Sequence, residues 1–169
     1  MAKTRRRWLS AVAVLALATI LVGTRLLGSP IILYPASPSL PAGPYLRTFE
    51  PIRVGKIVAF AMPDAARRYQ IELGHDVPAS FLFMKPIIAG PGDRVCNSVV
   101  DGLVVNGTWR ASTVSHDRDG RLLPVWTACH VLGEDRYFMV SGHVPNSFDS
   151  RYFGPVDAAR IAAVYRPLF

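Results

Sequence analysis

The chain has 169 residues, enough for one domain plus a short additional segment, and half of its residues are hydrophobic. Its net charge is +7, but five of the 19 basic side chains lie among the first 25 residues, where no acidic residue occurs. The other 14 basic and 12 acidic side chains leave only +2 for the rest of the chain, and this balance argues against a nucleic-acid-binding domain.

The first predicted element is an uncharged, apolar segment from Trp8 to Thr24, preceded by the basic cluster Lys3–Arg7. A membrane-spanning helix needs roughly 17–25 residues, and flanking basic residues stay on the cytoplasmic side. We therefore predict a cytoplasmic tail and a single transmembrane anchor over residues 1–28, followed by an exported domain over residues 29–169. A cleaved signal peptide is the alternative, although no clear A-x-A cleavage site follows the apolar run.

A proline-rich segment, PASPSLPAGPY from Pro35 to Tyr45, follows the apolar run. Each of its four prolines lacks an N–H and has a fixed φ, so the segment is predicted to be a stiff loop rather than a helix or a central strand. This loop carries two hydroxyl groups, Ser37 and Ser39, and its stiffness suits a side chain that must be held in place.

Downstream of this loop, short apolar runs alternate with turn signals. Strands are predicted within the apolar runs at residues 54–63, 81–95, 136–142 and 160–166. Between the first two of these strands, a short helix is predicted from Asp64 to Leu73, with Asp64 as its N-cap and with Arg67 and Arg68 solvated.

Further turn signals complete the prediction of the fold. The Asp-Gly and Asn-Gly pairs within Ser98–Arg110 separate runs of valine and predict a hairpin. The polar segment Ser112–Arg121 is predicted to be a surface loop. The expected fold class is mainly β: an antiparallel β domain with short helices, preceded by one N-terminal transmembrane helix.

Lys85 is the only charged residue in the predicted strand from Phe81 to Ile88. Alternation along a strand puts it on one face with Phe83 and Ile87, and the opposite face is apolar as well. Burial disfavours the charged amine and lowers its pKa from about 10.4, so Lys85 is expected to be uncharged near pH 7 and to act as a general base. In the alternative interpretation, its stem packs among apolar neighbours while the ammonium reaches water.

Three polar residues alternate in the segment SFDSR: Ser147, Asp149 and Arg151. In an extended chain they point the same way, so Asp149 and Arg151 can form an ion pair, and Ser147 can hydrogen-bond an amine and orient it. An ion pair with a purely structural role is the alternative. Because a serine becomes a nucleophile when a base takes its proton, the loop serines together with Lys85 suggest a Ser–Lys arrangement.

The chain has two cysteines, Cys96 and Cys129. An even pair in an exported domain usually forms a disulfide, so a bond between them is predicted. A metal site would need more ligands at short spacing, and His130 beside Cys129 is weak support for one. No metal and no other cofactor are therefore expected.

Four segments, taken in order, resemble the type I signal peptidase superfamily (peptidase family S26), and most of all its conjugative-transfer branch of the TraF type. Ser39–Tyr45 matches the nucleophile box S-x-P-x-G-x-Y, and Gly55–Phe60 resembles the strand that follows it. Lys85–Asp93 matches the box in which a lysine lies eight residues before the aspartate of a Pro-Gly-Asp turn. Ser147–Val156 matches S-x-D-S-R-x-F-G-P-V.

The resemblance implies a role for each matching residue. Ser39 would be the nucleophile and Lys85 the general base, while Ser37 occupies the position of a hydroxyl that helps to bind the oxyanion. Asp149 matches a residue that the transfer branch requires. Because a free carboxylate beside Lys85 would raise the pKa of that lysine, we expect Arg151 to neutralise Asp149, which would then shape the site through this pair.

The resemblance therefore implies a membrane-anchored Ser–Lys endopeptidase of the bacterial cytoplasmic membrane, with residues 29–169 as its periplasmic peptidase domain. The implied partners are a pilin-subunit precursor, bound as an extended strand between the Ser39 loop and the Lys85 strand, the membrane, and other conjugative-transfer proteins, but no nucleic acid. The precursor would be hydrolysed or cyclised. One alternative is a general type I signal peptidase, which the departures at Ser141-Gly142-His143 and Pro86 disfavour. Another is a non-catalytic scaffold of a pilus or secretion complex.

Overall fold

The computed structural model describes residues 28–142, 144 and 147–169, together with residues 8, 10, 12, 14, 15, 18 and 19 of the N-terminal segment. Among these residues, no helix is both long and apolar enough to cross a bilayer. Most of the anchor predicted over residues 1–28 lies outside the described residues, so the anchor and the periplasmic location stay predictions.

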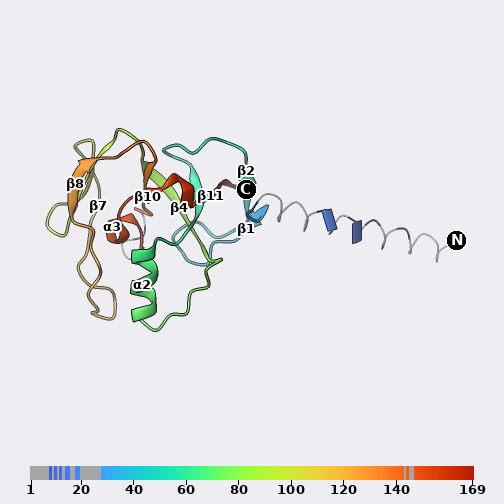
Figure 1. The fold of residues 1–169 in the computed structure, drawn as a ribbon, viewed down its shortest axis with the longest axis horizontal. Helices are drawn as coiled ribbons and strands as arrows, with labels where there is room; N and C mark the ends of the chain where they lie inside the picture. Colours follow the sequence, from blue (N-terminus) through green and yellow to red (C-terminus); the bar gives the residue numbers. More distant parts are fainter. Residues whose placement is uncertain are drawn as a thin grey trace.

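The larger of two sheets has seven strands and contains the strand of Lys85. Its strand order is β1 (Ile32–Leu33), β2 (Tyr45–Thr48), β11 (Ile161–Pro167), β3 (Ile57–Ala61), β4 (Leu82–Ala89), β9 (Arg136–Met139) and β10 (Val156–Asp157). Every neighbouring pair is antiparallel. Figure 1 shows β1, β2 and the C-terminus together at one end of the domain. These strands confirm the mainly antiparallel β fold class.

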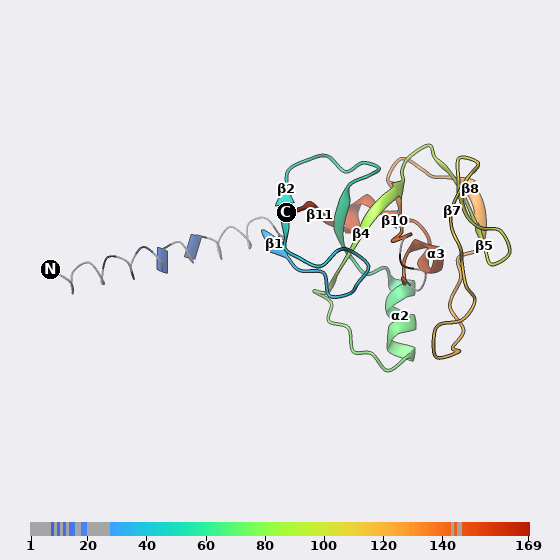
Figure 2. The same cartoon turned by 180° about the vertical axis from the view of Figure 1, so that it is seen from behind.

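The smaller sheet has four strands, in the order β7 (Thr108–Ala111), β6 (Gly102–Val105), β5 (Arg94–Ser98) and β8 (Ala128–Val131). It lies at the opposite end of the domain from β1 and the C-terminus (Figure 2). β6 and β7 form the predicted hairpin, in which Asn106 and Gly107 both have positive φ, 51° and 79°. Two-residue hairpin turns of this kind favour Asn-Gly because these residues tolerate the left-handed conformation.

Cys96 on β5 and Cys129 on β8 are direct partners across the strand pair and form a disulfide. The predicted bond is therefore confirmed. It joins positions 33 residues apart in the chain, and such a cross-link adds about 2–4 kcal/mol to the free energy of unfolding, mainly by restricting the unfolded chain.

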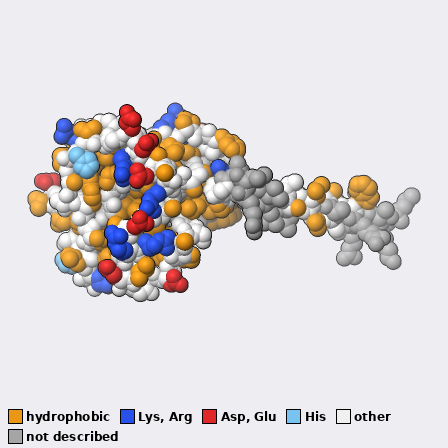
Figure 3. All heavy atoms as spheres, in the orientation of Figure 1, with side chains coloured by type: hydrophobic (Ala, Val, Ile, Leu, Met, Phe, Trp, Pro, Cys, Tyr) orange, Lys and Arg blue, Asp and Glu red, His pale blue; other side chains and the backbone are white. Residues whose placement is uncertain are grey.

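Acidic and basic side chains are interspersed on the face of the domain shown in Figure 3, in keeping with the small net charge outside the N-terminal segment. Surface ion pairs such as Arg136–Asp157 (3.3 Å) and Arg160–Asp64 (2.7 Å) join elements that are distant in the sequence. Exposed pairs of this kind contribute little stability, so the fold depends on its apolar core.

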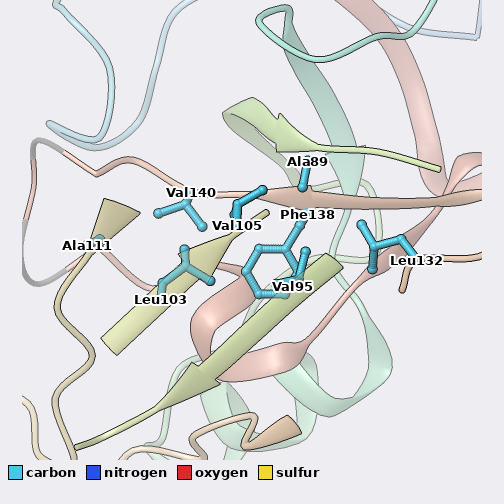
Figure 4. Packing of buried hydrophobic residues seen from close by; sticks show 8 residues of the cluster. All are labelled: Ala89, Val95, Leu103, Val105, Ala111, Leu132, Phe138 and Val140. Atoms are coloured by element: carbon cyan, nitrogen blue, oxygen red, sulfur yellow. The ribbon is translucent and has the colours of Figure 1, made fainter. Parts of the chain in front are cut away.

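The apolar core fills the space between the two sheets and continues around the larger one. Figure 4 shows the part between the sheets, whose buried side chains are Ala89, Val95, Leu103, Val105, Ala111, Leu132, Phe138 and Val140. β4 contributes to this cluster and to two others, through Ala89, Ile87 and Met84 respectively. Because β4 is buried on both faces, its sequence is an almost continuous apolar run, in which Lys85 is the exception.

Helix α2 (Asp64–Glu72) begins differently from the prediction. Pro63, not Asp64, is its N-cap, and Asp64 is the first helical residue and makes no capping hydrogen bond. The carboxylate of Asp64 instead accepts a hydrogen bond from Nη2 of Arg160. The N-cap prediction is wrong because Arg160 competes for the carboxylate of Asp64. In the first turn of the helix, the negative charge of this carboxylate still interacts favourably with the helix dipole.

The two arginines of α2 have different environments. Arg68 is exposed, as predicted, but Arg67 is half-buried and donates from Nη1 to the carbonyl oxygen of Val77 over 2.6 Å, so its predicted solvation is wrong. The other helices described are short: α3 (Ser150–Phe153) and a 3₁₀ turn, η1 (Ala158–Arg160).

Candidate active site

The proline-rich loop between β1 and β2 holds two neighbouring hydroxyl groups. Ser37 Oγ donates a hydrogen bond to Ser39 Oγ over 2.9 Å, and Ser39 is only 6% exposed. Contacts that attach the loop to the domain include the burial of Leu40 in an apolar cluster, the hydrogen bond from the Tyr45 hydroxyl to the carbonyl oxygen of Pro41, and that from the backbone N–H of Leu168 to the carbonyl oxygen of Pro44. Because the prolines restrict the backbone as well, the two serines are kept in a defined position.

Lys85 lies on a central strand of the larger sheet. Its backbone on β4 pairs with Val58 of β3, and its side chain is buried, with 3% exposed. Nζ donates a hydrogen bond to Oγ of Ser147 over 2.9 Å, although the two residues are 62 positions apart. The amine is therefore buried, as the apolar strand predicts, and does not reach water by extending its stem.

Burial lowers the pKa of Lys85 to about 8, because the charged ammonium loses its hydration. Asp149 acts in the opposite direction and raises the pKa of Lys85, while Arg151 lowers it. At pH 7 an amine with this pKa is neutral in about a tenth of the molecules. The predicted direction of the pKa is confirmed, and a neutral fraction of the amine is available as a base near pH 7.

The segment from Ser147 to Arg151 is not extended throughout, contrary to the prediction, because helix α3 begins at Ser150. Asp149 is the N-cap of helix α3, and its carboxylate accepts a hydrogen bond from the backbone N–H of Arg151 over 3.2 Å. Aspartate is favoured at this position because its side chain satisfies N–H groups that have no partner in the first helical turn. The side chains of Asp149 and Arg151 still meet, because Arg151 lies in the turn that Asp149 caps.

Asp149 and Arg151 form a buried ion pair, with side chains 0% and 1% exposed. Nε and Nη2 of Arg151 donate to the two carboxylate oxygens over 2.8 and 2.9 Å, which is the fork geometry typical of strong arginine–carboxylate pairs. The same guanidinium donates from Nη1 to the carbonyl oxygen of Ser112 and from Nη2 to that of Ser147. Arg151 therefore neutralises Asp149, as expected, and also holds the backbone of the residue that binds the Lys85 amine.

A cleft of about 390 Å³ is lined by Ser37, Ser39, Lys85 and Ser147. Within the described part of the chain, the hydrogen-bond partner of Ser39 Oγ is Ser37, and that of Lys85 Nζ is Ser147. The candidate nucleophile Ser39 and the candidate base Lys85 thus face one cleft without a hydrogen bond joining their side chains in the described structure. Catalytic hydrogen bonds are often completed only when substrate binds, so this geometry is compatible with proton transfer.

A second cavity, of about 720 Å³, adjoins the first, and both are bordered by Ser37, Phe83 and Lys85. Its other lining is mostly apolar and comes from the end of β1, the start of the proline-rich loop, and the first half of β4 with the residue before it, including Leu33, Tyr34, Pro35, Ala36, Phe81, Leu82 and Met84. This half of β4 pairs with β3, whereas β9 joins β4 only at Ile87 and Ala89. Among the described strands, none pairs with the other edge of β4 from Leu82 to Lys85.

Two parts of the cleft wall do not follow from the sequence analysis. Phe148 lines the cleft and stacks on Tyr69 of α2 and on Tyr152 of α3, with ring centroids 5.3 and 5.7 Å apart. Phe148 could have been predicted to line the cleft from its position next to Ser147 in the sequence. Charged residues between 117 and 121 also line the cleft, and only tertiary contacts bring them there. In the ranges that the structure describes, no three His, Cys, Asp or Glu side chains converge as a metal site requires.

Comparison with known proteins assigns the chain to a family. The family model described as signal peptidase, peptidase S26, matches residues 5–169. The chain belongs to the S26 signal peptidase family. As a member of this family it is a serine peptidase that acts on a peptide substrate.

The relatives of this S26 peptidase include plasmid transfer proteins. Two plasmid transfer proteins TraF from Escherichia coli are 32% and 33% identical to it, and each alignment covers 77% of this chain and 78% of the relative. A conjugal transfer protein TraF from Agrobacterium fabrum is 36% identical over 51% of this chain and 48% of its own. A solved signal peptidase I from Enterococcus faecalis aligns with a TM-score of 0.41 and 22% identity over 69% of this chain and 98% of its own. The expected resemblance to the S26 family and its TraF branch is confirmed.

Proposed function

We propose that this S26 peptidase is a membrane-anchored Ser–Lys endopeptidase that processes a pilin-subunit precursor for conjugative plasmid transfer, on the periplasmic side of the bacterial cytoplasmic membrane. The observation that supports this proposal most is the buried amine of Lys85 in the same cleft as the hydroxyl of Ser39. The apolar run behind a basic cluster supports the anchor, and the similarity to TraF proteins supports the role in transfer.

In the proposed reaction, Ser39 Oγ attacks the carbonyl carbon of the scissile bond, and the neutral amine of Lys85 accepts the hydroxyl proton. The backbone N–H of Ser39 and the hydroxyl of Ser37 stabilise the oxyanion that forms. When the tetrahedral intermediate collapses, the peptide bond breaks, the Lys85 ammonium gives its proton to the leaving amine, and an ester of Ser39 remains. Water or an amino group of the product then attacks this ester, with Lys85 again as the base, to give a linear or a cyclic product.

Ser147 supports this chemistry by contacting the amine of the general base, and Asp149 and Arg151 support it without touching the reacting atoms. The hydroxyl of Ser147 accepts a hydrogen bond from Lys85 Nζ and so directs the amine, while Arg151 holds the carbonyl oxygen of Ser147. Since Asp149 is paired with Arg151, its tendency to raise the pKa of Lys85 is offset, and part of the amine remains available as a base at neutral pH.

The substrate is proposed to bind as an extended strand. The edge of β4 from Leu82 to Lys85 that pairs with none of the described strands offers backbone groups to such a strand, and the apolar cavity beside it can take side chains from one side of the scissile bond. A general signal peptidase would bind in the same way, so binding geometry alone does not separate the two functions.

The proposal is tested by co-expressing the full chain with a pilin precursor, and separately with an ordinary exported preprotein, followed by intact-mass measurement of each product. Processing of the pilin precursor only is expected, and a product lighter by one water than the linear form would report cyclisation. The Ser39→Ala variant is the control and should leave both precursors intact. Processing by Ser39→Ala would overturn the mechanism, and a chain that binds but never cleaves would be a scaffold.

The value of kcat/KM is expected to depend on pH with a midpoint near 8, because Lys85 acts as a base only when it is deprotonated. Below the midpoint the neutral fraction, and with it kcat/KM, should rise about tenfold per pH unit, and above the midpoint kcat/KM should level off. A fluorogenic peptide assayed from about pH 6 to about pH 10 measures this profile. A midpoint close to 10.5, the ordinary pKa of lysine, would show that the amine of Lys85 is solvated and not tuned as a base.

A further inference from the structure

The sequence between Ser112 and Arg121 is a polar loop that the proposed mechanism does not use. Its tip, which we call the charged loop, comprises residues 117–121. The chain around it leaves the smaller sheet and extends toward α2 (Figures 1 and 2). Four of its five residues line the catalytic cleft together with Ser39 and Lys85, namely Asp117, Arg118, Asp119 and Arg121.

Hydrogen bonds within the charged loop hold it in one conformation. Asp117 Oδ1 accepts from the backbone N–H groups of Asp119 and Arg121, both over 2.9 Å. The Arg121 guanidinium donates from Nε to Asp117 Oδ2 over 2.8 Å and from Nη2 to Asp119 Oδ2 over 2.5 Å. A bridge between His116 and Leu122 closes the base of the loop. The charged loop therefore has its conformation in the absence of a substrate.

The two cavities that meet at Lys85 and Ser37 differ in the charged side chains that border them. Among the described residues, the larger one is lined mostly by apolar side chains with Lys85 as its charged residue, whereas the catalytic cleft is also bordered by two carboxylates and two guanidinium groups. A peptide whose scissile carbonyl lies at Ser39, and which runs through both cavities, has one arm in each. An apolar arm that covered the charged loop would remove water from charged groups and give them no new partners, which costs free energy.

We infer that the charged loop selects substrates by polarity: it accepts a polar or charged arm on the side of the scissile bond away from the apolar cavity, and it disfavours an apolar arm there. This inference rests on the proposed peptidase function and specifies one half of its substrate. Asp119 is the residue best placed to do this, since 70% of its side chain is exposed and one of its oxygens is oriented by Arg121. Arg118, which is also exposed, adds a charge of opposite sign.

The test uses two fluorescent peptides that share one small, apolar arm. The other arm is rich in Ser, Asn, Lys and Glu in the first peptide, and in Val and Leu in the second. The unchanged full-length protein should cleave the first with a kcat/KM at least about tenfold higher, the ratio that corresponds to about 1.4 kcal/mol. In the double variant Arg118→Ala/Asp119→Ala, which keeps the Asp117–Arg121 pair, this ratio should fall toward one, chiefly because the apolar-arm peptide is cleaved better.

The matched control is Arg94→Ala/Glu134→Ala, which removes one exposed charge of each sign away from the cleft lining and should leave the ratio unchanged. An equal ratio in the unchanged protein and in the charged-loop variant would overturn the inference. If neither peptide is cleaved, the proposed peptidase function is in question, and fluorescence polarisation of the same two peptides then measures selection by the charged loop from their Kd values. Equal Kd values for both peptides would overturn the inference in that case too.

Discussion

Replacing Lys85 by methionine is expected to abolish peptidase activity and, at the same time, to make the protein more stable. Loss of the base should lower kcat/KM by about 10³-fold or more, as for other residues that act as a unit with a nucleophile. Methionine has a similar length and no charge, so it fills the same space on β4 without the cost of burying an amine. The lowering of the pKa of Lys85 from 10.5 to about 8 corresponds to roughly 3 kcal/mol of unfavourable burial below pH 8, a cost that methionine does not have.

The stabilisation by Lys85→Met should depend on pH in a defined way. The pKa of Lys85 is lowered from 10.5 in the unfolded chain to about 8 in the folded one, so the unfolded state binds more protons between these values. The free energy of unfolding of the unchanged protein therefore rises with pH from about 8 to 10.5, as the folding penalty of the amine disappears. The advantage of the methionine variant should be largest below pH 8 and should vanish above 10.5.

Chemical denaturation of the full-length chain in detergent, followed at several pH values, measures this difference. Ser39→Ala is the matched control, because it should remove activity without the pH-dependent gain in stability. A Lys85→Met variant that is less stable than the unchanged protein at pH 7 would show that the hydrogen bond to Ser147 outweighs the desolvation of the amine.

Replacing Arg151 by methionine is expected to destabilise the protein by about 3–5 kcal/mol, because the change leaves the carboxylate of Asp149 buried without its partner. Activity should also fall at pH 7. Arg151 lowers the pKa of Lys85 and Asp149 raises it, so removal of the arginine shifts this pKa upward and reduces the neutral fraction. The midpoint of the pH profile of kcat/KM should therefore move above 8.

The double variant Asp149→Asn/Arg151→Met distinguishes charge from packing as the cause. Without the carboxylate there is no uncompensated buried charge, so the double variant should be more stable than Arg151→Met alone, and its pH midpoint should return toward lower values. If both variants are equally unstable and have the same midpoint, the ion pair does not act through its charge. The loss would then come from the hydrogen bonds that Arg151 makes to the carbonyl oxygens of Ser112 and Ser147.

These two predictions describe a site that is costly to maintain. The buried amine of Lys85 and the buried pair of Asp149 and Arg151 are less favourable for folding than apolar side chains of the same size. The apolar clusters to which β4 contributes, together with the disulfide between Cys96 and Cys129, offset that cost. In this protein the free energy gained from the apolar core and the disulfide therefore offsets the cost of burying the polar groups of the site.

Several site features could be predicted from short stretches of sequence because they depend on local rules. Strand alternation in an apolar run such as FLFMKPII predicts that the lysine is either buried or extended to water, because both faces of the strand are apolar. The stiffness of the Ser37–Ser39 loop follows from its prolines, and the hairpin at Asn106-Gly107 follows from the φ values these residues tolerate. Where a tertiary partner competed with a local rule, as Arg160 does for the carboxylate of Asp64, the prediction was wrong.

By itself, the sequence determined the chemistry available to this protein: a stiff loop with two serines, one lysine in an apolar strand, and the oppositely charged Asp149 and Arg151 two positions apart. Only the tertiary structure decided how these groups meet. Lys85 binds Ser147 across 62 residues of chain, Asp149 caps a helix instead of continuing an extended segment, and the charged loop borders the cleft. The reason is physical: backbone preferences act between near neighbours in the chain, whereas burial, desolvation and the pKa of Lys85 depend on groups that folding brings together from far apart.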